Sequence, residues 1–198
     1  ESLPVSTISS QEVLEDTANA SKSGKGMCVG QPHTTIDLRV IAIDDEAIGV
    51  WSDVTELEAN AIGEICVRGP QVTRLYDNKP EQTALAKIQD GETFWHRMGD
   101  VGYLDEQGRL WFCGRKSHRV TTAKGPRFSV PCEAIFNNHP DVYRSALVGL
   151  GNKGAQKPAI VVEPEPGKFP TVNEEGAFRA QLLELAAQNP LTEDITDI

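Results

Sequence analysis

Short stretches of apolar residues recur along the chain from about residue 34 to residue 122, and the first of them alternates with polar positions. TTIDLRVIAID places Ile36, Leu38 and Val40 on one side of an extended backbone, which is the pattern of a strand with one buried face. Shorter apolar runs follow in EICVRG, VTRLY, TFWHRMG and HRVTT, with turn-forming residues between them. Short strands in this arrangement predict a small antiparallel barrel or sandwich.

The stretch HRMGDVGYLDEQGRLWFCGRKSHRV contains the clearest turn. Its residues 105–108, DEQG, separate two apolar and aromatic flanks, so we expect a β-hairpin. One helix is predicted among the strands, in PEQTALAKIQ, where Pro80 suits a first turn and Glu81 a helix N-terminus. The polar segment before residue 32 gives only a weak helix signal, QEVLEDTANA, and SKSGKG is predicted to be a surface loop without the spacing of a phosphate-binding loop.

The pattern changes after about Val120. PCEAIFNNHP predicts a short helix, VYRSALVGLG and KPAIVVEPEP predict two strands, and EEGAFRAQLLELAAQ predicts an amphipathic helix with one face formed by Phe178, Leu182 and Leu185. The expected fold class is therefore α+β, with a barrel-like β-rich part followed by a small α+β domain. We expect the domains to be residues 1–114 and 115–198, joined by a hinge near residues 115–118.

Composition excludes several classes of function. The 198 residues carry a formal net charge of −10, and no Lys/Arg cluster exceeds two residues, which argues against nucleic-acid binding. No apolar run approaches the ~20 residues of a membrane span, and no signal peptide opens the chain. The dispersed histidines offer no zinc spacing. The four cysteines form no CxxC pair, so we expect reduced, buried thiols and a cytoplasmic protein.

Two longer stretches follow one another as GEICVRGPQVTRLYDNKPEQT, from Gly63, and RMGDVGYLDEQGRLWFCGR. They resemble G-E-[LI]-x-[VI]-x-G-x-x-[VL]-x-x-x-Y-x-x-x-P-x-x-T and [RK]-T-G-D-x-[GA]-x-x-D-x-x-G-x-[LI]-x-[FY]-x-G-R. These are motifs of the adenylate-forming enzymes, which include acyl-CoA synthetases, adenylation domains and luciferases. The resemblance covers roughly residues 1–150 and implies an AMP-forming ligase that uses ATP and Mg²⁺.

The resemblance also implies roles for individual residues. Asp100 matches the Asp that accepts hydrogen bonds from both ribose hydroxyls, a task that suits an acceptor-only carboxylate. Arg115 matches an Arg that reaches the ribose and marks the interdomain linker. Glu1 looks like the last letter of Y-G-x-T-E, whose Glu binds magnesium on the triphosphate. Without the resemblance, Asp100 would be interpreted as a solvated turn residue and Arg115 as part of a surface ion pair.

Three departures from the family pattern concern the residue two positions before Asp100, the hinge and the loop after the hinge. Met98 stands where Thr or Ser is usual, and Ser117, beside Lys116, stands where the hinge residue is usually Asp or Lys. The loop TTAKGPRFSVPCE keeps Gly125 and Arg127, which the resemblance directs toward the site. The loop is one residue longer than usual before its Gly and lacks the usual ending. In CoA-using members this loop lines the pantetheine tunnel, so the departures put CoA use in doubt.

CGRKSHRVTTAKG and the residues that follow it look most like the β-lactone synthetases of bacterial olefin biosynthesis. That resemblance implies adenylation of a 2-alkyl-3-hydroxy fatty acid, closure to a β-lactone by the substrate's own hydroxyl, and the other olefin-pathway enzymes as partners. Two alternatives stay open: a long-chain fatty acyl-CoA synthetase, and a non-catalytic interaction module with this fold.

Both ends of the chain resemble cuts through a longer protein, so we expect a C-terminal segment. The family's phosphate loop is absent. Its catalytic Lys follows the last helix, whereas Lys153, Lys157 and Lys168 all precede the corresponding helix here. We therefore assign no catalytic residue to this segment and expect it to be inactive alone.

Overall fold

The computed structural model describes residues 1–198, which divide into two compact units. The first unit contains residues 1–15 and 28–117, and the second contains residues 16–27 and 118–198. The chain thus passes between the units after residues 15, 27 and 117, and the last of these passages lies in the stretch predicted as a hinge. The assignment of residues 16–27 to the second unit had no signal in the sequence.

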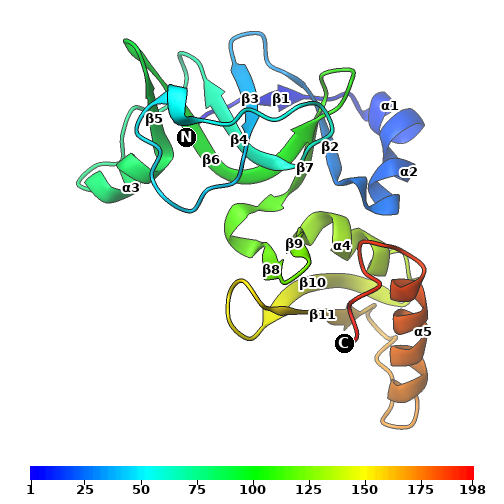
Figure 1. The fold of residues 1–198 in the computed structure, drawn as a ribbon. Coiled ribbons are helices and arrows are strands. Elements are labelled where there is room, and N and C mark those ends of the chain that lie inside the picture. The colour runs from blue at the N-terminus through cyan, green and yellow to red at the C-terminus, as the bar shows by residue number, and fades with distance from the viewer. The chain divides into compact units, whose positions relative to one another are not determined.

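The first unit is built on a curved sheet of seven strands in the order β1-β2-β7-β6-β4-β3, with β5 paired to β6 (Figure 1). The pairs β1–β2, β3–β4, β4–β6, β5–β6 and β6–β7 are antiparallel. The sheet curls into an open half-barrel, which confirms the predicted barrel-like fold. Its strands are β1 (Ser6–Thr7), β2 (Met27–Pro32), β3 (Asp37–Ile41), β4 (Gly63–Arg68), β5 (Lys87–Asp90), β6 (Thr93–Leu104) and β7 (Leu110–Arg115).

Apolar side chains cover both faces of the central strand β4. On one face, Ile65 and Val67 pack in a buried cluster with the apolar residues that the sequence placed on one side of an extended segment. These residues are Ile36, Leu38 and Val40, in and just before β3. On the other face Cys66 packs in a separate cluster with Ile41, Ile88 and Trp95. A strand buried on both faces explains why EICV is almost continuously apolar, and it makes the charged residue of that run, Glu64, an exception.

The predicted hairpin joins β6 to β7, and Asp105 organises its turn. Oδ1 of Asp105 accepts hydrogen bonds from the backbone N–H of Gln107 at 3.0 Å and of Arg109 at 2.9 Å. Its Oδ2 accepts from Arg109 Nε at 2.8 Å and from Trp111 Nε1 at 2.9 Å. Gly108 has a φ of +75°, a conformation that favours glycine. These contacts confirm the hairpin.

Two predictions in the middle of the first unit were wrong. The segment VTRLY, predicted as a strand, is irregular. Gly69 begins a turn to Val72, and the backbone N–H of Tyr76 donates to Thr83 Oγ1 rather than to the carbonyl of a neighbouring strand. The helix predicted through residue 89 ends earlier, as α3 (Pro80–Ala86). Residues 87–90 form β5 because they bury Ile88 and pair with β6, so tertiary contacts override the helical pattern.

Residues 10–25 form consecutive helical turns with a kink at Gly24, which confirms the helix predicted in QEVLEDTANA. The run consists of α1 (Ser10–Glu12), α2 (Ala18–Ala20) and two π-type turns, and Ser9 caps its start by accepting from the backbone N–H of Glu12 at 3.1 Å. SKSGKG, predicted as a surface loop, contains its last turn. Gly24 has a φ of +88° and lies against Pro131, Ile135 and Leu191, so packing within the second unit orders this turn.

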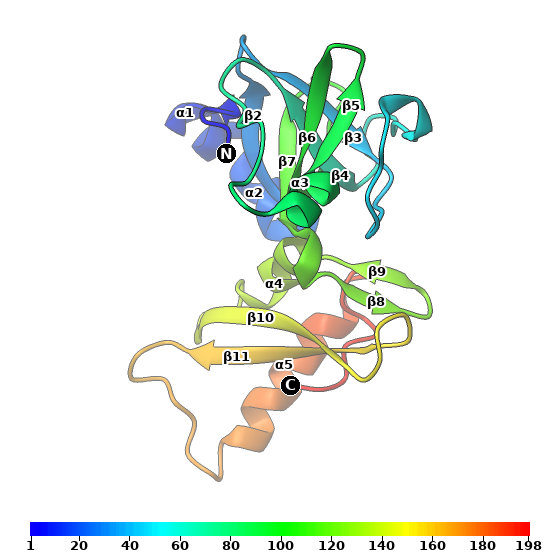
Figure 2. The ribbon, with the colours of Figure 1, turned by 90° about the vertical axis from the view of Figure 1, so that its left-hand side faces the viewer.

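The second unit pairs β10 (Val142–Leu150) with β11 (Lys157–Pro164) in an antiparallel sheet, next to α4 (Ser129–Phe136) and α5 (Glu175–Ala187) (Figure 2). A second hairpin joins β8 (Val120–Thr122) to β9 (Gly125–Arg127). Leu182 of the predicted helix face is buried, and Phe178 packs against the same core. The core consists of Val120, Cys132, Phe136, Val142, Leu147, Ile160, Leu182, Ala186 and Ile195.

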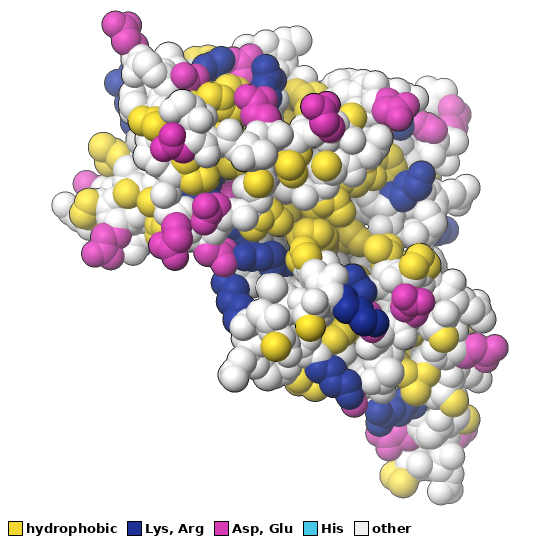
Figure 3. All heavy atoms as spheres, in the orientation of Figure 1, with side chains coloured by type: hydrophobic (Ala, Val, Ile, Leu, Met, Phe, Trp, Pro, Cys, Tyr) yellow, Lys and Arg dark blue, Asp and Glu magenta, His cyan; other side chains and the backbone are white.

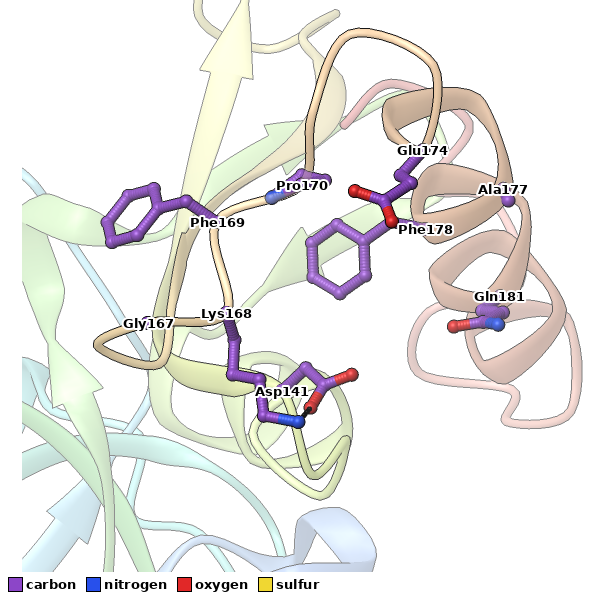
Figure 4. A pocket seen from close by; sticks show the side chains of 9 residues that line it. All are labelled: Asp141, Gly167, Lys168, Phe169, Pro170, Glu174, Ala177, Phe178 and Gln181. Carbon is purple, nitrogen blue, oxygen red and sulfur yellow. Dashed lines mark ion pairs between the residues drawn. The ribbon is translucent and has the colours of Figure 1, made fainter.

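A cavity of about 400 Å³ lies in the second unit, between α5 and the loop that precedes it (Figure 4). Lys168 and Asp141 form an ion pair of 3.3 Å on its wall. Phe169 and Phe178 also line it. None of the site residues predicted from the sequence lies here.

Acidic side chains are scattered over the surface, with Lys and Arg between them rather than in one basic patch on the face seen in Figure 3. All four cysteines are free and buried, as predicted, and burial raises the pKa of the Cys113 thiol to about 12. No helix combines the length and the apolar character that crossing a membrane requires.

We predict that Asp105→Asn destabilises the first unit by about 1–3 kcal/mol at neutral pH, because hydrogen bonds to a charged group are lost. Burial alone would raise the pKa of Asp105, but the donors on Trp111 and Arg109 outweigh it and hold the pKa below its ordinary value. A lowered pKa stabilises the fold above the unfolded value of about 3.9, and this contribution is lost as the pH falls through the folded pKa.

Urea unfolding at pH 7 and near pH 3 measures this contribution. The difference between wild type and variant should shrink at the lower pH. Asp77→Asn is the matched control, since Asp77 is exposed and accepts only from the neighbouring Asn78 side chain. An equal difference at both pH values would contradict the assignment.

Candidate functional site

Asp100 and Arg115, both predicted from the sequence as nucleotide-binding residues, lie directly opposite one another on β6 and β7. Nη1 of Arg115 donates to Asp100 Oδ1 at 2.8 Å. The Asp100 side chain is 19% exposed and that of Arg115 is 54% exposed. The hairpin therefore brings the two residues together as cross-strand neighbours.

A glycine precedes each residue of this pair, and both glycines have a positive φ. Gly99 has a φ of +66° and Gly114 has a φ of +125°. Residues with a Cβ rarely adopt such backbone angles. The Gly-Asp and Gly-Arg pairs in the sequence are thus explained by backbone geometry at the two strand positions that carry the charges.

Burial raises the pKa of Asp100 above its ordinary value, even though the Arg115 guanidinium acts in the opposite direction. The negative charges of Glu1 and Glu64 add to the increase. The positive charge of Arg115 therefore favours the ionised form of Asp100, which burial disfavours.

An open cleft of about 370 Å³ lies beside Arg115. Asp100 does not line it, but the two residues before it do. The lining contains four cationic and two carboxylate side chains, so the cleft favours an anionic ligand. It is formed by Glu1, Glu64, Tyr76, Lys79, Gln82, Leu85, Ala86, Arg97, Met98, Gly99, Arg115 and Lys116.

Glu1 faces this cleft with a carboxylate held by two neighbours. The hydrogen bond from Tyr76 is the main cause that lowers the pKa of Glu1, and a hydrogen bond with His96 adds to it. Nε2 of the fully buried His96 lies 2.9 Å from Glu1 Oε2. The Glu1 side chain remains 43% exposed, so an ionised carboxylate is presented to the cleft.

Glu64, Arg97 and Lys116 form a charged cluster in the lining of the cleft, which the sequence did not predict as a unit. Nη2 of Arg97 lies 2.7 Å from Glu64 Oε2. Nζ of Lys116 lies 3.0 Å from Glu64 Oε1. The one signal available was a Glu inside an apolar strand, since such a residue is buried only when it is paired.

The remaining predicted residues lie after this cluster. Ser117 belongs to a single 3₁₀ turn, Lys116–His118. Gly125 and Arg127 belong to the second unit, where Arg127 Nη2 lies 2.9 Å from Asp194 Oδ2 and its Nε lies 3.3 Å from Oδ1. Gly125 has a φ of +112° and open space beside it. The role of this loop at the cleft remains a prediction.

No cluster of three or more His, Cys, Asp or Glu side chains could hold a metal ion by itself. Glu1 is the carboxylate at the cleft with the most solvent access, as Glu64 is 1% exposed. A cation there would need most of its ligands from a bound molecule or from water.

No family model matches the chain, but its sequence is similar to those of known proteins. Over 172 residues it is 50% identical to the olefin β-lactone synthetase of Xanthomonas campestris, covering 84% of this chain and 31% of that protein. Over 195 residues it is 46% identical to the olefin β-lactone synthetase of Stenotrophomonas maltophilia, covering 96% of this chain and 35% of that protein. The chain is therefore similar over most of its length to two proteins named as olefin β-lactone synthetases. It spans about a third of the length of these two relatives.

A solved adenylate-forming ligase has the same fold. The o-succinylbenzoate CoA synthetase of Bacillus subtilis, in complex with the acyl-adenylate intermediate OSB-AMP, matches with a TM-score of 0.67 at 22% identity, over 93% of this chain and 32% of that one. This likeness concerns the fold alone.

We predict that Arg115→Met raises the pKa of Asp100 further, because the guanidinium opposes the effect of burial. A raised carboxyl pKa means that stability is lost as the pH rises through the folded pKa, so the variant should lose more stability between pH 4 and pH 7 than wild type. NMR titration of the Asp carboxyl carbons measures the pKa. Arg144→Met, which breaks an exposed pair with Glu163, should leave it unchanged, and an unchanged Asp100 pKa in Arg115→Met would contradict the assignment.

Proposed function

We propose that this chain is part of an ATP-dependent ligase that activates a fatty acid as its adenylate. The observation that supports this most directly is the Asp100–Arg115 pair beside a cationic cleft. The boundary between the large nucleotide-binding domain and the smaller mobile domain is proposed to lie at residues 114 and 115, with Arg115, Lys116 and Ser117 forming the hinge.

In this proposal Asp100 binds the ribose of ATP. Its two carboxylate oxygens are acceptors for the two ribose hydroxyl donors. Arg115 stabilises the ionised form of Asp100, which matters because burial disfavours that form. When a nucleotide excludes water from the pair, the attraction between the two charges becomes stronger, so ligand binding and ionisation of Asp100 support one another.

Glu1 fits the role of a magnesium ligand in the same proposal. Its carboxylate is ionised, half-exposed and oriented by Tyr76 and His96. Magnesium in nucleotide sites usually takes one or two protein carboxylates and completes its ligands with phosphate oxygens and water, which suits the single accessible carboxylate. Bound Mg²⁺ would supply charge neutralisation on the triphosphate, while Tyr76 and His96 fix the direction of the Glu1 oxygens.

We propose a 2-alkyl-3-hydroxy fatty acid as the substrate, on the basis of the two β-lactone synthetase relatives. The acid's carboxylate displaces pyrophosphate from ATP and forms an acyl adenylate. The substrate's 3-hydroxyl loses its proton and attacks the acyl carbon, and the bond to AMP breaks as the four-membered lactone closes. Because the nucleophile is intramolecular, proximity replaces a second substrate. A cytoplasmic location together with other olefin-pathway enzymes is part of the proposal, supported by four free cysteines.

Two alternative functions account for less of what is observed. A fatty acyl-CoA synthetase agrees with the fold likeness to a CoA synthetase, but that likeness is at 22% identity. Met98, Ser117 and the longer loop before Gly125 depart from the pattern of CoA-using members. A non-catalytic module would have no need for the paired Asp100 and Arg115.

The whole gene product, assayed with ATP and a 2-alkyl-3-hydroxy acid, should release AMP and pyrophosphate and form a β-lactone. CoA should change neither product nor rate, because the hydroxyl that closes the ring is already present. Mass spectrometry of the product and a pyrophosphate assay measure both. A CoA thioester would favour the acyl-CoA synthetase, and absence of AMP would overturn the ligase proposal.

The same assay on the isolated 198 residues should release no pyrophosphate. Lys153, Lys157 and Lys168 all precede α5, whereas the family's catalytic Lys follows the last helix. Turnover by this segment above the background of an Asp100→Ala variant would overturn this part of the proposal.

A further inference from the structure

The cluster of Glu64, Arg97 and Lys116 connects the two strands that carry Asp100 and Arg115. Arg97 lies on β6, three residues before Asp100, and Lys116 directly follows Arg115 at the end of β7. Glu64 of β4 contacts both cations, at 2.7 Å and 3.0 Å. The carboxylate of Glu64 therefore links β6 to the end of β7 through ion pairs with residues close to Asp100 and Arg115.

This cluster is far less accessible to water than the pair beside it. The side chains of Arg97 and Glu64 are 2% and 1% exposed. Arg97 also donates to the backbone carbonyls of Asp44, Glu46 and Leu85. Ion pairs shielded in this way are screened little by water and salt.

Lys116 is the member at the margin of the cluster, 19% exposed. Its Nζ donates to the carbonyl of Asp44 at 2.9 Å in addition to its contact with Glu64. Arg97 alone can neutralise Glu64, so the charge balance of the core survives the loss of Lys116. Lys116 can therefore be replaced without leaving a buried, unpaired carboxylate.

The side chain of Arg115, in contrast, is held only by Asp100 and by a long contact of 3.5 Å with the Met98 carbonyl. Its side chain is 54% exposed, and exposed ion pairs contribute little to stability or to fixed geometry. The preceding residue is Gly114, which has a φ of +125°. Glycine has no Cβ, so its backbone is less restricted than that of other residues. Arg115 is the last residue of β7 and pairs with Asp100 there. Along the chain, its backbone has a permissive glycine before it and the anchored Lys116 after it.

We propose that Lys116 is a positioning residue for nucleotide binding: its ion pair with Glu64 holds Arg115 opposite Asp100. This inference rests on the proposed nucleotide role of the Asp100–Arg115 pair. Lys116 does not itself contact the ribose in this account. It acts through Arg115, by fixing the end of β7.

Calorimetry of AMP binding to the whole gene product tests this role. Lys116→Met should weaken AMP binding about tenfold, within the range of coupling between contacting residues, and Lys116→Arg should restore most of it. The KM for the fatty acid should stay unchanged. Lys168→Met is the matched control, because Lys168 forms an exposed ion pair with Asp141 in the second unit (Figure 4), and it should bind AMP as wild type does.

A double-mutant cycle separates positioning from a general loss of structure. In an Arg115→Ala background, Lys116→Met should have almost no further effect on the Kd for AMP. Equal effects in both backgrounds, or a wild-type Kd in Lys116→Met, would overturn the inference. If Lys116→Met does not fold, Lys116→Gln replaces it in the same cycle. Absence of AMP binding by the wild-type protein would overturn the proposed function instead.

Discussion

A buried carboxylate paired with two cations is the constraint on which the first unit depends. Glu64 lies in the strand that is covered on both faces by apolar side chains, where an unpaired charge would be prohibitive. Arg97 and Lys116 neutralise it, and backbone carbonyls satisfy the remaining donors of Arg97. Removing Glu64 would leave two cations without their anion, at a cost of about 3–5 kcal/mol. The cluster therefore fixes how β4, β6 and the end of β7 lie together.

The hairpin between β6 and β7 places Asp100 and Arg115 next to this rigid cluster. Asp105 closes the turn at one end through four hydrogen bonds. The Glu64 cluster fixes the other end, where Asp100 and Arg115 face one another. Between these two fixed points the strands act as a spacer, and the glycines before Asp100 and Arg115 allow the backbone angles that present the charges.

The sequence predicted the elements whose signal is local. The alternation in β3, the DEQG turn and the strands β10 and β11 were all recognisable from patterns or turn residues. It failed where tertiary contacts decide. Residues 87–90 form a strand despite their helical pattern, because Ile88 is buried and the segment pairs with β6. The segment around Gly24 was predicted as a loop but forms a turn, because Gly24 packs against the second unit's core. A single sequence contains no record of such contacts.

For the site, too, residues marked by a local motif were predictable, and those defined by tertiary contacts were not. Asp100 and Arg115 stood out through motifs, and the hairpin explained how residues 15 positions apart could meet. The partners of Glu64 could not be named, because burial identifies a charge as paired but not the residue that pairs with it. Tyr76 and His96 were missed for the same reason, since their contacts with Glu1 join segments far apart in the chain.

The central claim, that Asp100 binds the ribose of the nucleotide, is tested most directly by the Kd for AMP of Asp100→Asn in the whole gene product. An amide replaces the carboxylate without changing its shape, and Asp77→Asn serves as the exposed control. Loss of a charged acceptor for hydroxyl donors should weaken AMP binding at least about tenfold in Asp100→Asn and leave the control unchanged. Wild-type affinity in Asp100→Asn would contradict the account.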